Sequence, residues 1–355
     1  QLAPGGGLTL TGALAVDGGT VKLDGNYPTG TDNVALGNTA LDSVEAGGIN
    51  NVAIGDNAGT AITTGDCNVA VGKDALTTNS TGTRNTAIGQ GALTANTTAD
   101  NNTAVGKNSM VANTEGHSNV AVGANALDAN TTGDNNTAIG MDALTANTTA
   151  NQNTAVGDEA LKLNTTGDCN TAVGKGSLDT NTTGTRNVAV GGEALGANTT
   201  ASFNNALGYK ALCSNTTGAS NISIGTCSMR INTTGANNVA VGDKALCANT
   251  TASNNTAVGN AALCLNTTGT DNIAMGSCTL DANTTGNSNT AIGRLSLTAN
   301  TTGSNNSAVG AGSLLTNTTG DSNVAFGVSS LRLNTTGDFN TGIGLCSIYT
   351  NTTGG

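Results

Sequence analysis

Eight cysteines carry most of the reactive chemistry that this sequence offers: Cys67, Cys169, Cys213, Cys227, Cys247, Cys264, Cys278 and Cys346. No two of them have the C-x-x-C spacing of a metal or redox site. Cys213 and Cys227 are 14 residues apart, as are Cys264 and Cys278, at matching places in a repeat. Each pair would therefore suit a disulfide between neighbouring repeats. Cys247, one repeat before Cys264, is a competing partner, and unpaired thiols at variable positions are the remaining interpretation.

Other catalytic arrangements are missing from the sequence. His117 is the single histidine, and no Ser-His-Asp set or phosphate-binding glycine loop before a helix is visible. Acidic residues such as Asp168, Asp271 and Asp338 recur after an N-T-T-G segment, but they lack the G-G-x-G-x-D pattern of calcium-binding rolls. We expect these carboxylates to lie in solvated turns. The chain is predicted to be no enzyme and to use no cofactor or metal.

The tripeptide N-T-T is also an N-glycosylation sequon. If its asparagine points outward, the sequence predicts a dense sugar coat. If the asparagines stack as a buried ladder, threonines such as Thr132 and Thr149 become the alternative attachment points. The candidate acceptors are Asn130, Asn147, Asn164, Asn181, Asn198, Asn215, Asn232, Asn249, Asn266, Asn283, Asn300, Asn317 and Asn334.

All of these residues are positioned by one repeated unit, N-T-A-V-G-x-x-A-L-x-x-N-T-T-G-x-x. The glycine of its N-T-A-V-G pentad occurs at Gly37 and Gly55, and then every 17 residues from Gly72 to Gly344, without insertion or deletion. Because loops tolerate changes in length, so strict a period gives every residue a fixed place in a stack. The sequence predicts an all-β parallel β-solenoid, or β-roll, of nineteen 17-residue rungs over 33–355, preceded by an N-terminal β segment over 1–32.

Two short strands are expected in each rung. In the pentad, alternation places Ala155 and Val156 on opposite faces, and both faces look packed. Ala160 and Leu161 are expected to form the second strand and to close a small core. Each glycine is expected at a corner that requires a positive φ or a close backbone approach. The two asparagine columns are expected to form buried hydrogen-bonded ladders.

Composition narrows the range of partners. The chain has 51 Gly but no Trp, 3 Phe and 3 Tyr, which does not describe ordinary globular cores. A formal charge of -11 disfavours nucleic acid and anionic membranes, and no apolar run is long enough to span a bilayer. The chain begins at Gln1 instead of Met, so we expect a processed, exported protein.

Each rung offers few large apolar side chains, worth about 1.5–3 kcal/mol each when buried. Ordering its backbone costs on the order of 1–2 kcal/mol per residue. We therefore expect chains to associate along the rod, with one apolar face inside the coil and the other against a partner. Three parallel chains are the leading arrangement, and a single narrow solenoid is the alternative.

The segments N-V-A-V-G (187–191), N-T-A-V-G-D-E-A-L (153–161) and N-V-A-I-G-D-N-A (51–58) resemble the head repeats of trimeric autotransporter adhesins. The resemblance implies a left-handed β-roll, three chains around one axis, and display on a bacterial surface for attachment to a host surface or glycan. The N-T-T-G segment makes this unit longer than that family's. The repeats are also similar to those of phage tail fibres, as is G-N-Y-P-T-G-T (25–31).

These observations predict an extracellular structural fibre or adhesin-like filament, on a cell surface or a virion. The repeat stays in phase to Gly355, so we expect residues 1–32 to dock on the last rung of a second copy and give a head-to-tail filament. A phage or virus tail-fibre shaft is the alternative. An ice-binding solenoid ranks last, because such surfaces favour T-x-T, whereas the adjacent Thr165 and Thr166 would point in opposite directions.

Overall fold

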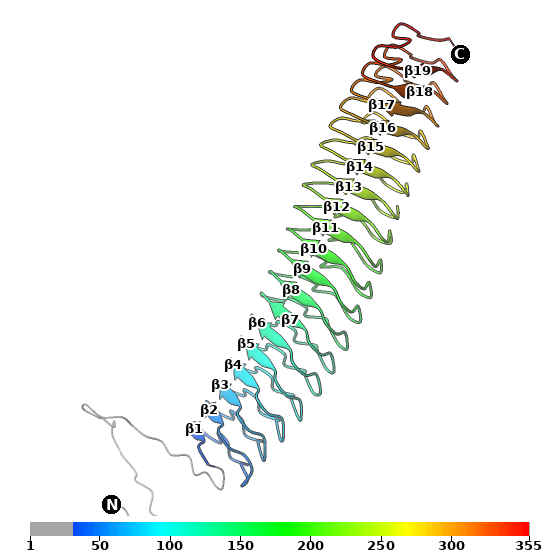
Figure 1. The fold of residues 1–355 in the computed structure, drawn as a ribbon. Coiled ribbons are helices and arrows are strands. Elements are labelled where there is room, and N and C mark those ends of the chain that lie inside the picture. Colours follow the sequence, from blue (N-terminus) through cyan, green and yellow to red (C-terminus); the bar gives the residue numbers. More distant parts are fainter. Residues whose placement is uncertain (1–30, 355) are drawn as a thin grey trace, which may run out of the picture.

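The computed structural model describes residues 31–354, which form a single curved rod of stacked rungs (Figure 1). Each of the nineteen strands has three residues and pairs in parallel with the next strand along the chain, as Thr154 does with Thr171. They are β1 (Val34–Leu36), β2 (Val52–Ile54), β3 (Val69–Val71), β4 (Thr86–Ile88), β5 (Thr103–Val105), β6 (Val120–Val122), β7 (Thr137–Ile139), β8 (Thr154–Val156), β9 (Thr171–Val173), β10 (Val188–Val190), β11 (Asn205–Leu207), β12 (Ile222–Ile224), β13 (Val239–Val241), β14 (Thr256–Val258), β15 (Ile273–Met275), β16 (Thr290–Ile292), β17 (Ser307–Val309), β18 (Val324–Phe326) and β19 (Thr341–Ile343).

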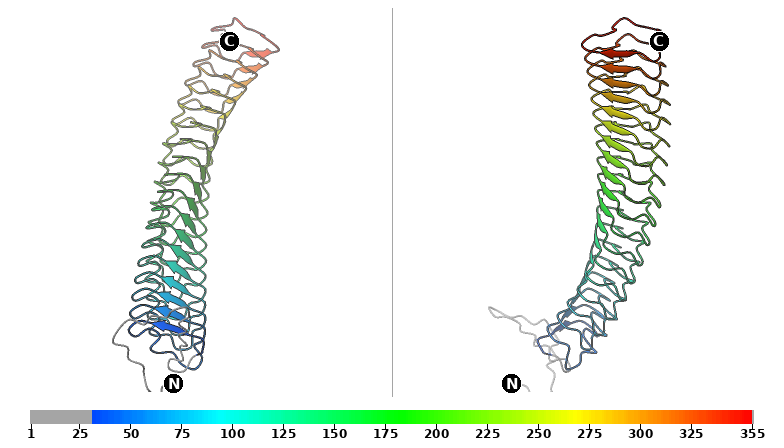
Figure 2. Two further views of the ribbon diagram at one scale, coloured as in Figure 1. Left: turned by 90° about the vertical axis from the view of Figure 1, so that its left-hand side faces the viewer. Right: turned by 45° about the vertical axis from the view of Figure 1, so that its right-hand side comes forward.

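This single parallel sheet confirms the predicted β-solenoid, and no helix occurs between residues 31 and 354. At about 4.8 Å per rung, nineteen rungs make a rod roughly 90 Å long. Figure 2 shows that the stack bends and that its strands turn progressively along the axis, as twisted sheets do. The predicted N-terminal β segment, and its docking on a second copy, lie almost entirely outside the described residues.

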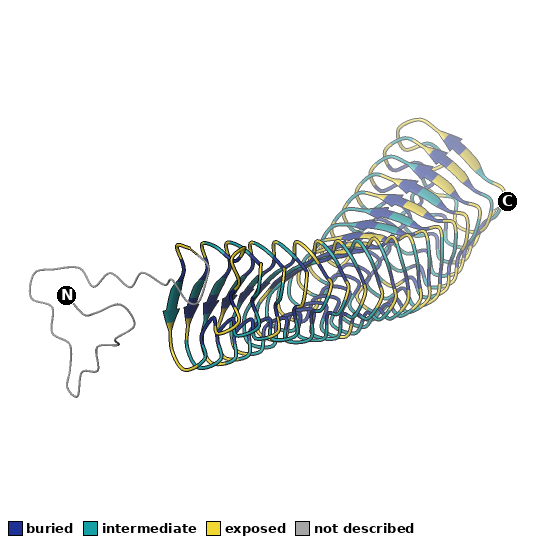
Figure 3. Ribbon diagram, turned by 90° about the horizontal axis from the view of Figure 1, so that it is seen from below, coloured by how far each residue is buried: buried dark blue, intermediate teal, exposed yellow. Residues whose placement is uncertain are grey.

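In each strand, only the middle residue points into the core. Ala155 in β8 and Ala172 in β9 are completely buried, whereas the residues on either side of them are only partly covered. The alternation predicted for the pentad is confirmed, but the packing predicted for both of its faces is not found within one chain. The outer face of the sheet remains accessible along the rod (Figure 3).

The predicted second strand is wrong. The Ala-Leu segment forms a turn in which Glu159 and Leu161 have φ values of 58° and 51°. A left-handed conformation costs a non-glycine residue about 1–2 kcal/mol. Two interactions offset that cost at Leu161. Its side chain is fully buried, which is worth about 2 kcal/mol, and its N–H donates to the Ser177 carbonyl of the next rung at 3.0 Å.

The core consists of two alanine columns and one leucine column, and nearly all of its side chains are inaccessible to solvent. Met110 and Met229 replace leucine without opening the core. The leucine column is interrupted at Gly59. There, the side chain of Ile62 occupies the missing volume, because a Cβ on Gly59 would lie 3.0 Å from its Cδ1. The small predicted core is thus present, but turns close it.

The two glycine columns serve different purposes. Pentad glycines have φ between 114° and 141°, and a Cβ on Gly174 would lie 2.8 Å from the carbonyl oxygen of Gly191 in the next rung. Glycines of N-T-T-G, such as Gly184, have no positive φ but lie equally close to the next rung. The prediction of a special backbone path or a close approach is confirmed for both columns.

Alanine replaces the second glycine in every third rung over one stretch of the rod, at Ala99, Ala150, Ala201 and Ala252. In rungs with glycine, the backbone N–H groups of the two residues before the glycine donate to the same carbonyl of the next rung. Thr165 and Thr166, for example, both donate to the carbonyl of Thr182, at 2.9 and 3.2 Å. The four alanine rungs lack this second hydrogen bond, although their asparagine still donates to the alanine carbonyl, as Asn147 does to Ala150 at 3.1 Å. Alanine at this position therefore removes one hydrogen bond between rungs, and the rung keeps its place in the stack.

Adjacent alanines in one turn provide a test of the left-handed positions. Ala261 has φ 53° and is partly exposed, whereas Ala262 is completely buried and has no positive φ. Ala261→Gly should stabilise the rod by about 1 kcal/mol, because glycine adopts this conformation without a steric penalty. Ala262→Gly should destabilise it by a similar amount or more, through lost packing and greater freedom of the unfolded chain. Denaturant unfolding measures both, and equal effects of the two substitutions would contradict the turn geometry.

Candidate functional site: the outer face of the sheet

A regular surface along the whole rod is formed by the first and third residues of strands β1 to β19, which we call the outer sheet face. None of these residues is charged. The third residue is always apolar, and the first is mainly Thr or Val, with Asn205 and Ser307 as the other polar types. Exposed fractions include 38% for Val188, 49% for Leu207 and 59% for Phe326. The chain thus presents a long, uncharged and mostly apolar strip to its surroundings.

Two asparagine ladders hold this face in register. In the ladder at the start of the pentad, the Oδ1 of Asn153 accepts the backbone N–H of Asn170 at 2.9 Å, and the Nδ2 of Asn170 donates to the carbonyl of Gly184 at 2.8 Å. Asn153 is the exception, since its own Nδ2 is buried without a hydrogen-bond partner in the described structure. Because these bonds join successive rungs beside the strand, they fix its height and direction.

The second ladder uses the N-T-T asparagines and is continuous from Asn79 to Asn351. Asn232, for example, donates its Nδ2 to the Oδ1 of Asn215 at 2.9 Å and to the carbonyl of Gly235 at 3.0 Å. The first two rungs have Val44 and Ile62 at this position instead, and both are buried. Both expected buried ladders are therefore present, and they lie side by side, since Asn164 and Asn170 donate to the same carbonyl of Gly167.

This packing does not fit glycans on the thirteen candidate asparagines. The nitrogen that would carry the sugar is buried and already donates two hydrogen bonds in each of these residues, as in Asn164. A glycan there would remove one donor hydrogen and would have to pass through the core. The alternative acceptors, Thr132 and Thr149, lie in an exposed column. Sequence alone left this choice open because it does not show which way the asparagine points.

All eight cysteines are free thiols in the structure, including Cys213, Cys227, Cys264 and Cys278. The Cys213 thiol donates to the backbone carbonyl of Arg230 at 3.3 Å. Burial raises the pKa of the Cys213 and Cys264 thiols, which keeps them protonated and less able to undergo disulfide exchange. The disulfides suggested by the 14-residue spacing are thus not formed in this structure.

The acidic residues and the single histidine have a structural role that the sequence did not reveal. An Oδ1 of Asp168 accepts the backbone N–H of Asn151 at 2.6 Å, and Asp338 accepts that of Asp321 at 2.7 Å. His117 does the same with its Nδ1 for Asp100, at 2.9 Å. These side chains satisfy a turn amide of the preceding rung. Nowhere in residues 31–354 do three or more His, Cys, Asp or Glu residues gather in a way that would hold a metal ion.

No protein-family model matches this sequence, and no curated protein matches it either. The resemblance to adhesin head repeats and to tail fibres therefore stays a prediction, whereas the β-solenoid itself is established by the structure. Over the described part of the chain, no helix has the length and apolar character needed to cross a membrane.

The buried ladder predicts a large effect from exchanging one amide for a carboxylate. Asn232→Asp would remove both hydrogen bonds donated by Nδ2 and place a negative charge beside two acceptor oxygens. We expect a loss of about 3 kcal/mol in the free energy of unfolding. Asn237→Asp makes the same chemical change at an exposed turn and should have little effect. Denaturant unfolding of both variants is the measurement, and matching midpoints would argue against a buried ladder.

Proposed function

We propose that the chain is a non-enzymatic, extracellular structural fibre or adhesin-like surface filament, in which the outer sheet face packs against other copies of the chain. The observation that carries this proposal is that the face has no charged residue from β1 to β19. The turns, by contrast, carry ion pairs such as Lys175 with Asp158 at 3.0 Å and Lys210 with Glu193 at 3.3 Å. Charge is thus kept off one side of the rod.

The dimensions of the face suit a stable interface. A strip about 90 Å long and about 10 Å wide covers on the order of 900 Å² per chain, which is close to the roughly 800 Å² per partner of a standard specific interface. Uncharged, aliphatic residues at its centre are typical of permanent assemblies. A second copy is the partner whose face matches in length and in rung spacing.

Three parallel chains around a common axis are the arrangement that we propose. Each chain has one such face, so a closed ring of three buries every copy of it without leaving an edge that would recruit more chains. The resemblance to adhesin head repeats implies the same number. A tail-fibre shaft on a phage or virus would use an identical assembly, and it remains the alternative setting for this fibre.

One observation favours a second candidate, an ice-binding solenoid. Sequence reasoning placed the relevant threonines in N-T-T, where adjacent residues diverge. In the structure, a different pair lies on one face: Thr154 and Val156 of β8 are two residues apart, and neither is turned into the core as Ala155 is. This gives a regular T-x-V array along part of the rod, which would face water if the chain were a monomer.

Charges placed on the outer sheet face should separate the assembled chains. A variant carrying both Val156→Lys and Val173→Lys puts two ammonium groups per chain into the proposed interface, where their desolvation is unfavourable. We expect light scattering to give a multiple of the chain mass for the unmodified protein and a single chain mass for this variant. The control, Thr166→Lys with Thr183→Lys, charges an exposed column elsewhere and should stay assembled.

A monomeric unmodified protein would contradict the fibre proposal. If that monomer also showed thermal hysteresis that the Val156→Lys, Val173→Lys variant lost, the ice-binding candidate would replace it.

A further inference from the structure

A notch interrupts the turn surface near the C-terminal end of the rod. After the pentad glycine Gly310, the next two residues are Ala311 and Gly312. The equivalent residues are Arg294 and Leu295 in the preceding rung, and Val328 is equivalent to Ala311 in the following rung. The missing side chains leave a cavity of about 260 Å³ that these residues line. Since its neighbours are held in register by the ladders, the rod cannot collapse to fill the space.

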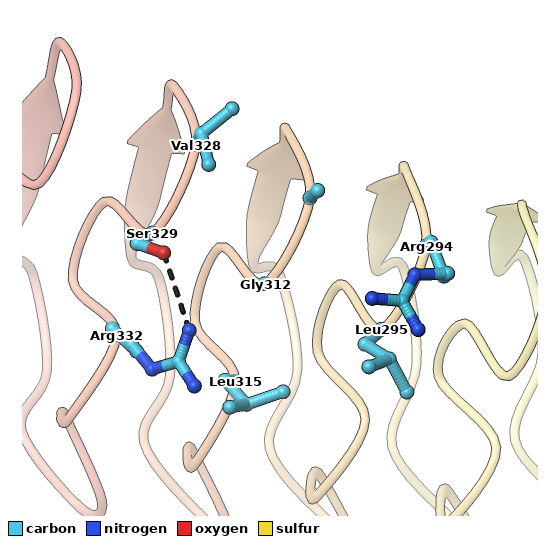
Figure 4. A pocket seen from close by; sticks show the side chains of 8 residues that line it. Arg294, Leu295, Gly312, Leu315, Val328, Ser329 and Arg332 are labelled. Carbon is cyan, nitrogen blue, oxygen red and sulfur yellow. Dashed lines mark hydrogen bonds between the residues drawn. The ribbon is translucent and has the colours of Figure 1, made fainter.

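Two arginines face each other across this notch. In Figure 4, Arg332 extends over Gly312 from one side, while the guanidinium of Arg294 points toward it from the other. A Cβ on Gly312 would lie 3.4 Å from Nη1 of Arg332. That same Nη1 donates to Oγ of Ser329 at 3.2 Å, which holds the half-buried Arg332 in this position.

Neither guanidinium has a carboxylate partner within residues 31–354. Between residue 282 and the end of the chain, the only acidic side chains are Asp321 and Asp338. Each of them accepts a backbone N–H of the preceding rung, Ser304 at 2.6 Å and Asp321 at 2.7 Å respectively. In a chain with a formal charge of -11, two unpaired arginines at one cavity are a local concentration of positive charge.

Apart from Ser329, the remaining side chains that line the notch are apolar. Leu295, Leu315 and Val328 also line the notch. Such a lining disfavours a doubly charged phosphate, which would lose more hydration than a singly charged group. The planar guanidinium fork matches a carboxylate through two parallel hydrogen bonds. The notch volume of about 260 Å³ lies just below the range of typical ligand pockets, which begins near roughly 300 Å³, and suits a ligand of about one ring.

We propose that this notch binds a small organic acid, with its carboxylate between Arg294 and Arg332 and its ring against Leu295, Leu315 and Val328. The carboxylate belongs either to an acidic sugar or to an aromatic or aliphatic acid. The site lies on the turn surface, so it does not depend on packing of the outer sheet face, and a monomeric chain would bind equally well.

The test is isothermal titration of the full chain with glucuronate, with benzoate, and with glucose as the uncharged probe. If glucuronate alone binds saturably, the ligand class is an acidic sugar. If benzoate binds, the ligand class is an aromatic or aliphatic acid. Either result supports the site provided that glucose does not bind. An Arg294→Gln, Arg332→Gln variant should weaken binding by at least about tenfold.

Two further variants separate a built site from general charge. Ala311→Leu fills the notch and leaves both arginines in place, so it should abolish binding. Arg186→Gln removes an arginine that lies over the Phe203 ring at 5.5 Å, away from the notch, and should leave binding unchanged. The proposal is overturned if neither acid saturates, if glucose binds as well as the acids, or if Ala311→Leu binds like the unmodified chain.

Discussion

The structure depends on one constraint: every rung must repeat the path of the preceding rung at the distance of hydrogen-bonded parallel strands. At the pentad glycine the next rung comes so close that a Cβ on Gly174 would touch the Gly191 carbonyl. Backbone amides of the turns also bond across rungs, as Leu161 does to Ser177. Among the described rungs, only the first holds an extra residue: β1 and β2 are 18 residues apart and still pair in register. Within the rungs that carry both asparagine ladders, a residue more or less would misalign all of these contacts together. The unchanging 17-residue period from Gly72 to Gly344 follows from this requirement.

The same constraint divides each rung into interior positions that accept only a few residue types and turn positions that vary widely. Alanine, leucine and the two asparagines fill an interior from which solvent is excluded. The solvent-facing residues of the turns differ between rungs, and it is there that the ion pairs and the notch at Gly312 occur. The outer sheet face is intermediate in how freely its residues vary, because they differ in size but never carry charge. A uniform rod with one uncharged side is suited to parallel assembly.

The sequence predicted the stack, the inward alanine and both asparagine ladders, because strict repetition leaves few places for each residue type. It failed at the Ala-Leu segment, since Leu161 adopts a left-handed conformation that leucine does not favour, and contacts with the next rung decide it. The direction of the asparagines, which decides against glycans, needed the complete rung. The outer T-x-V array and the notch beside Ala311 were also missed, because both arise from comparing equivalent positions in neighbouring rungs.

The most direct test of the stacking constraint compares the removal of one whole rung with the removal of one residue. Deleting residues 209–225 joins Gly208 to Thr226 in register, so hydrogen exchange should show protected amides on both sides and electron microscopy a rod about 5 Å shorter. Deleting Ala219 alone removes a small turn residue but shifts the register, and protection should be lost in the adjoining rungs. Equal protection in the two deletion variants would contradict the account.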